Sequence, residues 1–264
     1  MSEGVLTVTR GRWLNRGWRL LMTGCCFALF GAGGLLLSLV WFNLLLLIQR
    51  DPLRRRQLAR RSISWSFRLF LRSARALGVL DYHIDNAELL RSERRCLVVA
   101  NHPTLIDYVL LASAMPEADC LVKAGLQDNL FFCGVIRAAD YLVNSHAETL
   151  LPDSQRRLAQ GDVIIIFPEG TRSEPGMPLK LQRGAANIAV RSGGDLRLVQ
   201  IVCSQKTLNK QSRWYHIPPE KPIFRVSVRQ HIAIDDFIAG EEETYPRAVR
   251  HLTQFLQQAL TPVD

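Results

Sequence analysis

The amino-acid sequence predicts an α/β domain with a largely parallel sheet flanked by helices, preceded by an N-terminal membrane-embedded helical motif. From residue 81 onward, short apolar runs alternate with longer stretches of helical periodicity, which is typical of such a sheet. Thirty consecutive residues between Arg19 and Arg50 carry no charge. The charge is also uneven: residues 1–80 hold thirteen arginines against two acidic residues, whereas residues 81–264 hold twenty basic residues against twenty-two acidic ones.

These observations divide the 264 residues into a membrane anchor at 1–53, a basic amphipathic helix at 54–80 and an α/β domain at 81–264. Apolar residues make up 48% of the chain, which excludes wholesale disorder. The six cysteines have irregular spacing and form no Cys-x-x-Cys pair, so we expect reduced thiols rather than a disulfide scaffold or a zinc ribbon. No metal-ligand spacing stands out, and we expect no metal.

The uncharged segment from Leu20 to Gln49 is too long for a cleavable signal peptide. As a helix it would measure about 45 Å, against a hydrocarbon core of about 30 Å. It could form one tilted span, or a re-entrant hairpin broken at the Gly-Ala-Gly-Gly of residues 31–34. Arginines flank both ends, and the positive-inside rule then favours the hairpin, with the catalytic domain on the cytoplasmic face, at the inner membrane if the source is bacterial. A buried core helix is the remaining alternative.

Residues 54–77 have the periodicity of an amphipathic helix that ends at Gly78. A basic stripe runs along it, formed by Arg61, Arg68, Arg72 and Arg75. Beside a membrane anchor, we expect this stripe to contact anionic lipid, at about 1 kcal/mol per arginine. No nucleic-acid-binding motif accompanies the charge, so nucleic acid is not expected as a partner.

Within the α/β domain, continuous or alternating apolar runs predict strands at 97–100, 120–122, 163–167, 196–202 and 224–234. Helices are expected at 105–114, 151–160, 184–191 and 242–260, and a mixed helical stretch is expected to end at residue 138. Three of the strands run directly into polar residues: Asn101 to Thr104 with Asp107 beyond, Lys123, and Pro168 to Ser173. In a parallel sheet these three groups would gather at the carboxyl ends of the strands, where ligands bind.

The first polar group could supply a general base. A neutral imidazole at His102 can take a proton from a hydroxyl if a carboxylate, here Asp107, fixes its tautomer and stabilises the resulting cation. The alternative is structural, because Thr104 and Asp107 also have the spacing of a helix capping box.

The third group could bind an anion. Gly170 permits close backbone approach, and Arg172 offers a planar fork suited to phosphate or carboxylate. A surface turn with an incidental Glu–Arg pair is the alternative. Together, the two groups provide a base, its orienting carboxylate and an anion clamp, which is the equipment for transferring an acyl group to the hydroxyl of an anionic acceptor.

The sequence 101–107, Asn-His-Pro-Thr-Leu-Ile-Asp, resembles the first signature block of the glycerophospholipid acyltransferases, whose type members are 1-acyl-glycerol-3-phosphate acyltransferases. The sequence 167–173, Phe-Pro-Glu-Gly-Thr-Arg-Ser, resembles their third block, and the similarity extends over roughly residues 80–205. The resemblance implies an acyltransferase-like α/β fold on a membrane-embedded helical motif. It makes His102 the base and Asp107 its orienting residue. The implied substrate-binding residues are Asn101, Thr104, Lys123, Glu169, Gly170, Thr171 and Arg172.

The resemblance also implies the reaction partners. The acceptor hydroxyl of a membrane lipid would attack the thioester of acyl-carrier protein or acyl-CoA directly, with no further cofactor. No Gly-x-Ser-x-Gly sequence is present to supply a serine nucleophile.

Two positions depart from the family pattern. Asn144 stands near the place of an arginine that meets the acceptor phosphate, and Gln200 replaces a proline. Three alternatives follow: acylation of an amino-acid lipid or another lipid carrier, a non-catalytic lipid-binding scaffold, or hydrolysis with water in place of the acceptor. The basic and aromatic stretch 205–221 is either an ordinary surface loop or a rim that meets headgroups or an acidic carrier protein.

Overall fold

The computed structural model describes residues 2–126, 128–129, 133–144, 147–173, 177–238 and 244–261, with the side chains of 2–12, 123 and 147–148 left out. Helix 242–260 was expected to begin at Glu242, which lies outside these residues.

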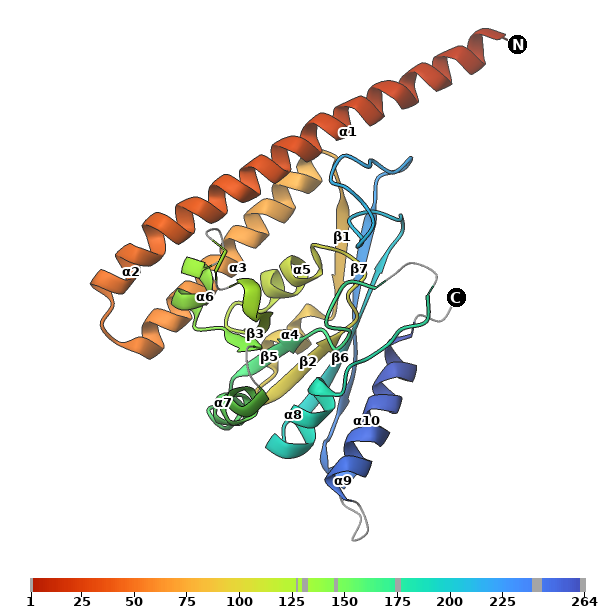
Figure 1. Ribbon diagram of the computed structural model, residues 1–264. Coiled ribbons are helices and arrows are strands. Elements are labelled where there is room, and N and C mark those ends of the chain that lie inside the picture. The colour runs from red at the N-terminus through yellow and green to blue at the C-terminus, as the bar shows by residue number, and fades with distance from the viewer. Residues whose placement is uncertain are drawn as a thin grey trace.

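A seven-stranded sheet forms the centre of the domain (Figure 1). Its strands are β1 (Asp81–Asp85), β2 (Cys96–Ala100), β3 (Asp119–Lys123), β4 (Leu142–Asn144), β5 (Val163–Ile166), β6 (Asp195–Cys203) and β7 (Ile223–Ile232). They lie in the order β1-β7-β6-β2-β5-β3-β4, and every neighbouring pair is parallel except β6 and β7. The five predicted strands are confirmed. The sequence missed β1 and β4, the two edge strands, because neither contains a continuous apolar run.

Helices cover both faces of the sheet. They are α4 (Ala87–Ser92), α5 (Asp107–Ala114), α6 (Cys133–Ala139), α7 (Ala147–Ala159), α8 (Gly184–Ser192), α9 (Asp235–Ile238) and α10 (Tyr245–Leu260), with a short 3₁₀ turn at Ala124–Leu126. Strand β2 is buried on both sides: Val98 and Ala100 pack with α5, whereas Leu97 and Val99 pack with α8 and α10. Burial on both faces is what makes a parallel strand apolar at every position.

The N-terminal part is a helical hairpin whose reversal lies further along the chain than predicted. Helix α1 (Ser2–Leu36), a π-helical stretch (Leu37–Trp41) and α2 (Phe42–Ile48) form one continuous arm, and α3 (Pro52–Ala76) returns alongside α1 (Figure 1). The predicted break at residues 31–34 is therefore wrong. The glycines of this stretch face open space, and α1 continues through them to Leu36.

The reversal instead uses residues 49–51. Gln49 leaves helical geometry with φ −98° and ψ 103°. Asp51 then caps α3 by accepting a hydrogen bond from the Leu53 amide at 2.9 Å, and Pro52 occupies the first helical position.

The arm from Trp13 to Ile48 is 36 residues of apolar helix, long enough to cross a membrane. Only 17% of its most apolar window is buried within the protein, which argues against the core-helix alternative. Its other side packs on α3, where the ring of Phe30 contacts those of Phe67 and Phe70.

The basic stripe on α3 is bound mainly to protein. Arg61 pairs with Glu117, Arg68 donates to the Ser113 carbonyl at 2.7 Å, and Arg75 pairs with Asp81 at 2.6 Å. Of the four predicted lipid contacts, only Arg72 remains exposed without such a partner among the described residues. The side chains of Arg61 and Arg75 are still 59% and 42% exposed, so contact of the stripe with anionic lipid stays a prediction.

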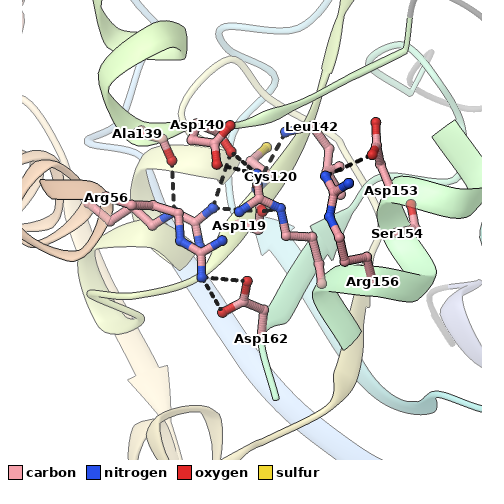
Figure 2. Close-up of polar contacts among 12 residues, drawn as sticks. Arg56, Asp119, Cys120, Ala139, Asp140, Leu142, Asp153, Ser154, Arg156 and Asp162 are labelled. Atoms are coloured by element: carbon pink, nitrogen blue, oxygen red, sulfur yellow. Dashed lines mark hydrogen bonds and ion pairs between the residues drawn. The ribbon is translucent and has the colours of Figure 1, made fainter. Parts of the chain in front are cut away.

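Two further arginines of α3 enter a buried ionic cluster (Figure 2). Arg60 pairs with Asp119 at 2.6 Å, and Arg56 pairs with Asp162 at 3.0 Å. Arg157 of α7 lies 3.6 Å from the same Asp119 carboxylate. Asp119 begins β3 and Asp162 precedes β5, so the cluster attaches α3 to the amino edge of the sheet.

Candidate active site

His102 and Asp107 lie together at the carboxyl end of β2. His102 Nδ1 is 2.9 Å from Asp107 Oδ2, and Asp107, the first residue of α5, is fully buried. The same Oδ2 accepts the Thr104 amide at 2.6 Å, and Oδ1 accepts the Thr104 hydroxyl. Both interpretations made from the sequence therefore hold geometrically, because one carboxylate contacts the imidazole and also closes the loop at the start of the helix.

This arrangement sets the state of the imidazole. A carboxylate at Nδ1 places the ring proton there and leaves the lone pair on Nε2. Burial raises the pKa of Asp107, while the hydrogen bonds from His102 and Thr104 act in the opposite direction and favour its ionised form. The ring of His102 stacks on Phe167 with a centroid separation of 4.3 Å, and about a fifth of its side chain is exposed. The site therefore holds an oriented, accessible base.

The turn after β5 makes hydrogen bonds to both the amide and the carbonyl of His102. Glu169 Oε1 accepts the His102 amide at 2.7 Å, and the Ser173 amide donates to the His102 carbonyl at 2.7 Å. Gly170 makes the turn with a φ of +69°, a conformation that side chains disfavour. Burial raises the pKa of Glu169. The structure thus gives Glu169 a contact with the backbone of His102, and its predicted contact with an acceptor stays a prediction.

Arg172 is anchored through one nitrogen. Its Nη1 donates to the carbonyls of Leu208 and Asn209 at 3.0 and 2.8 Å. Its Nε and Nη2 have no hydrogen-bond or ion-pair partner among the described residues, so one edge of the guanidinium is left for a ligand. Thr171 beside it is exposed.

Two predicted substrate-binding side chains are committed to the protein. Asn101 is 3% exposed. Its side-chain NH₂ donates to the Ile201 carbonyl at 2.8 Å and its side-chain oxygen accepts the Ile201 amide at 2.7 Å, which continues the pairing of β2 with β6. Thr104 is buried and bound to Asp107. Polar side chains at a buried strand end must satisfy the backbone around them, and contact of these two residues with a substrate stays a prediction.

The remaining predicted substrate-binding residue, Lys123, lies on another strand of the same sheet. Lys123 ends β3 and pairs in register with Asn144 at the end of β4, at the same edge of the sheet as the base. The side chain of Lys123 lies outside the described part of the structure. Gln200 is buried on β6, directly after Val199, the register partner of Ala100, and accepts a hydrogen bond from Arg229 at 2.6 Å.

Sequence reasoning missed two parts of the site. Phe167 supplies the stacking surface for the imidazole, although it was assigned only to a strand. Leu208 supplies carbonyl contacts to Arg172 and to the Leu105 amide, the latter at 2.9 Å. The segment 204–222 is therefore part of the site's wall, and its basic composition gave no signal of that.

One group of described residues could in principle hold a metal: Glu93, Cys96 and His231. Arg197 already donates to Glu93 Oε1 at 2.6 Å, so the group is an ion-paired cluster. Cys96 begins β2, whereas His102 follows its end, which places this group at the opposite edge of the sheet.

Comparison with known proteins agrees with this geometry. A family model described as Acyltransferase matches residues 81–204. Residues 81–204 are thus similar to the domain that this model describes. A human protein named 1-acyl-sn-glycerol-3-phosphate acyltransferase beta is 29% identical over 133 residues, which is 47% of this chain and 47% of that protein. The chain thus matches about half the length of this relative.

The chain also has a solved counterpart in fold. The crystal structure of the 1-acyl-sn-glycerophosphate (LPA) acyltransferase PlsC from Thermotoga maritima matches with a TM-score of 0.66 and 20% identity. The match covers 94% of this chain and 99% of that one, so the likeness includes the N-terminal hairpin. The predicted resemblance and the predicted fold class are both confirmed.

Proposed function

We propose that the protein is a membrane-associated O-acyltransferase that moves a fatty acyl chain from a thioester to the hydroxyl of a lysophospholipid-like acceptor. The observation that supports this most directly is the contact of His102 Nδ1 with Asp107 Oδ2 at 2.9 Å inside the region that matches the acyltransferase family model. The names of the human and Thermotoga proteins point to the same reaction class.

The proposed reaction uses His102 twice. Nε2 takes the proton of the acceptor hydroxyl as its oxygen attacks the thioester carbonyl, and Asp107 stabilises the imidazolium that forms. When the tetrahedral intermediate collapses, the C–S bond breaks and the imidazolium returns the proton to the leaving thiolate. The products are the ester and the free thiol, and no acyl-enzyme is formed. The donor is acyl-carrier protein or acyl-CoA.

The acceptor is an anionic lysolipid whose charged group meets the free edge of Arg172, with Lys123 as a second cation. Phosphate and carboxylate both suit a guanidinium fork. Asn144 at the neighbouring strand end keeps a second acceptor class open, the lyso form of an amino-acid lipid. The exposed apolar arm supports membrane association of the enzyme, and the arginines that follow it at residues 50–61 favour the cytoplasmic face for the α/β domain.

The test is transfer of a labelled acyl chain from acyl-CoA or acyl-carrier protein to a panel of lysolipids. His102→Ala should lower the rate about 10²–10⁴-fold, the usual contribution of general-base catalysis. His83→Ala, at an exposed position on β1, is the matched control and should leave the rate unchanged. Unchanged transfer by folded His102→Ala would refute the role of the base.

The same assay separates the alternatives. Release of fatty acid without any acceptor would indicate hydrolysis. Absence of transfer from either donor to every lysolipid would favour a lipid-binding scaffold.

A further inference from the structure

Helix α1 carries one buried arginine on an otherwise exposed stretch. Arg19 is 5% exposed, whereas its neighbour Trp18 is 53% exposed and Arg16, one turn earlier, is also exposed. Burying a guanidinium is costly unless hydrogen bonds compensate for the lost water. The contacts of Arg19 therefore indicate what its position on this helix accomplishes.

Those contacts reach the segment 204–222. Arg19 Nη2 donates to the carbonyls of Pro218 and Pro219 at 2.9 and 2.7 Å, and Nε donates to Asn15 Oδ1 at 3.1 Å. The two carbonyls are about 200 positions away in the sequence, so this is a built contact between distant parts of the chain.

A second contact docks the same segment on α1 one turn further along. The ring of Trp214 lies over Gly24, where even a methyl group would be 3.5 Å from its Cζ3 atom. The ring centroid is 6.2 Å from that of Phe27. Ile217, between Trp214 and the prolines, is buried. The segment is therefore attached to the apolar arm over more than one turn of helix.

The other end of the segment fixes the active-site edge. The carbonyls of Leu208 and Asn209 hold Arg172 Nη1. The Asn209 side chain stiffens this end, because its Oδ1 accepts the amides of Gln211 and Ser212 at 2.9 and 2.8 Å. The contacts form a continuous path from Arg19 to the guanidinium assigned to the acceptor.

We propose that Arg19 is a positioning residue for acceptor binding: it holds segment 204–222 against the apolar arm and so fixes where Arg172 presents its free edge. This inference rests on the proposed function, since it assumes that Arg172 meets the anionic acceptor. The helix that lies in the bilayer then also fixes the position of Arg172, the group that recognises the charged end of a bilayer lipid.

The test compares Arg19→Gln with Arg16→Gln, which removes the same charge from the same helix at an exposed position. Hydrogen exchange of the full-length protein in detergent should become faster across 204–222 in Arg19→Gln and stay unchanged in Arg16→Gln. The value of kcat/KM for lysophosphatidic acid should fall about tenfold or more through KM, as expected for loss of a buried charge-assisted pair of hydrogen bonds. The KM for the acyl donor should stay within twofold.

A double-mutant cycle tests the path itself. If Arg19 acts through Arg172, Arg19→Gln should add less than about twofold to the acceptor KM of Arg172→Lys, because coupled residues are not additive. Fully additive losses would overturn the proposal. If Arg19→Gln does not fold, Trp214→Ala, at a half-exposed position, removes the second docking contact and should give the same exchange and KM pattern.

The outcomes separate this proposal from the proposed function. Faster exchange in Arg19→Gln with an unchanged acceptor KM would refute positioning and leave the acyltransferase intact. Unchanged exchange in a folded Arg19→Gln protein would refute the docking. A wild-type protein that acylates no acceptor would refute both the function and the positioning role, whatever the exchange shows.

Discussion

Replacing Asp107 with asparagine tests whether the carboxylate orients the base or only closes the helix start. The native carboxylate accepts three hydrogen bonds: from His102 Nδ1 and from the amide and hydroxyl of Thr104. An asparagine side chain has one acceptor oxygen and one NH₂ group, so it cannot accept all three. With its NH₂ group at the Oδ2 position, asparagine would face two buried donors, His102 Nδ1 and the Thr104 amide; with it at the Oδ1 position, it would face only the Thr104 hydroxyl, which can rotate to accept.

The size of the effect of Asp107→Asn depends on which donor loses its acceptor. If the NH₂ group faces His102, the imidazole takes the other tautomer, its proton moves to Nε2 and the base is lost, which costs up to about 10⁴-fold in rate. That orientation also leaves the Thr104 amide unsatisfied, at about 1–3 kcal/mol of unfolding free energy. If the NH₂ group faces the Thr104 hydroxyl instead, the hydroxyl rotates to accept it and the tautomer is kept, but the imidazolium loses its stabilising negative charge. We expect the loss of rate to dominate and the melting temperature to fall modestly.

The assay is acyl transfer at saturating donor and acceptor, alongside thermal unfolding of the same preparation. Asp153→Asn is the matched control, because that carboxylate is 40% exposed and pairs only with Arg156 on its own helix. It should leave both measurements unchanged. An Asp107→Asn protein that folds and keeps its rate within tenfold of wild type would show that the carboxylate serves only the helix start.

Two further predictions concern stability. Asp119→Asn should cost about 3–5 kcal/mol of unfolding free energy, because Arg60 would lose a buried partner at 2.6 Å; chemical denaturation measures this, and a loss below 1 kcal/mol, like that expected for Asp153→Asn, would contradict it. Glu169→Gln should change the pH dependence of stability. Burial raises the pKa of Glu169 in the folded state, so its contribution is full at pH values below its unfolded range and is lost as pH rises through the folded pKa. The unfolding free energy of wild type minus that of Glu169→Gln should therefore decline from pH 4 to pH 8, and a flat difference would contradict this account.

Local sequence patterns predicted those parts of the fold that depend on local burial. Strands β2 and β5 were found because every residue in them faces a packed layer, and β6 because most of its residues do. The pairing of His102 with Asp107 was found because both lie in one loop-to-helix junction. The glycines at 31–34 misled, because a glycine-rich stretch weakens a helix only where water or another partner competes for its backbone.

Contacts over long sequence separations could not be predicted in the same way. The acceptor of the His102 amide is Glu169, and the partner of the Asn101 side chain is Ile201. Glu169 and Asn101 both matched a family motif, and their hydrogen bonds show that they also connect parts of the site to one another. Motif membership indicates that a residue belongs to a site, whereas only its hydrogen-bond partners distinguish a ligand-binding group from a supporting one.

The hairpin and the domain are joined at two opposite edges of the sheet, which has a consequence for the reaction. Arg56 and Arg60 fix α3 at the amino edge, through Asp162 and Asp119. Arg19 fixes α1 at the carboxyl edge, through the prolines of segment 204–222. Two separate attachments prevent the domain from pivoting about either one. The height of His102 relative to the apolar arm is therefore set by the fold, as the proposed transfer to a lipid hydroxyl at the membrane surface would require.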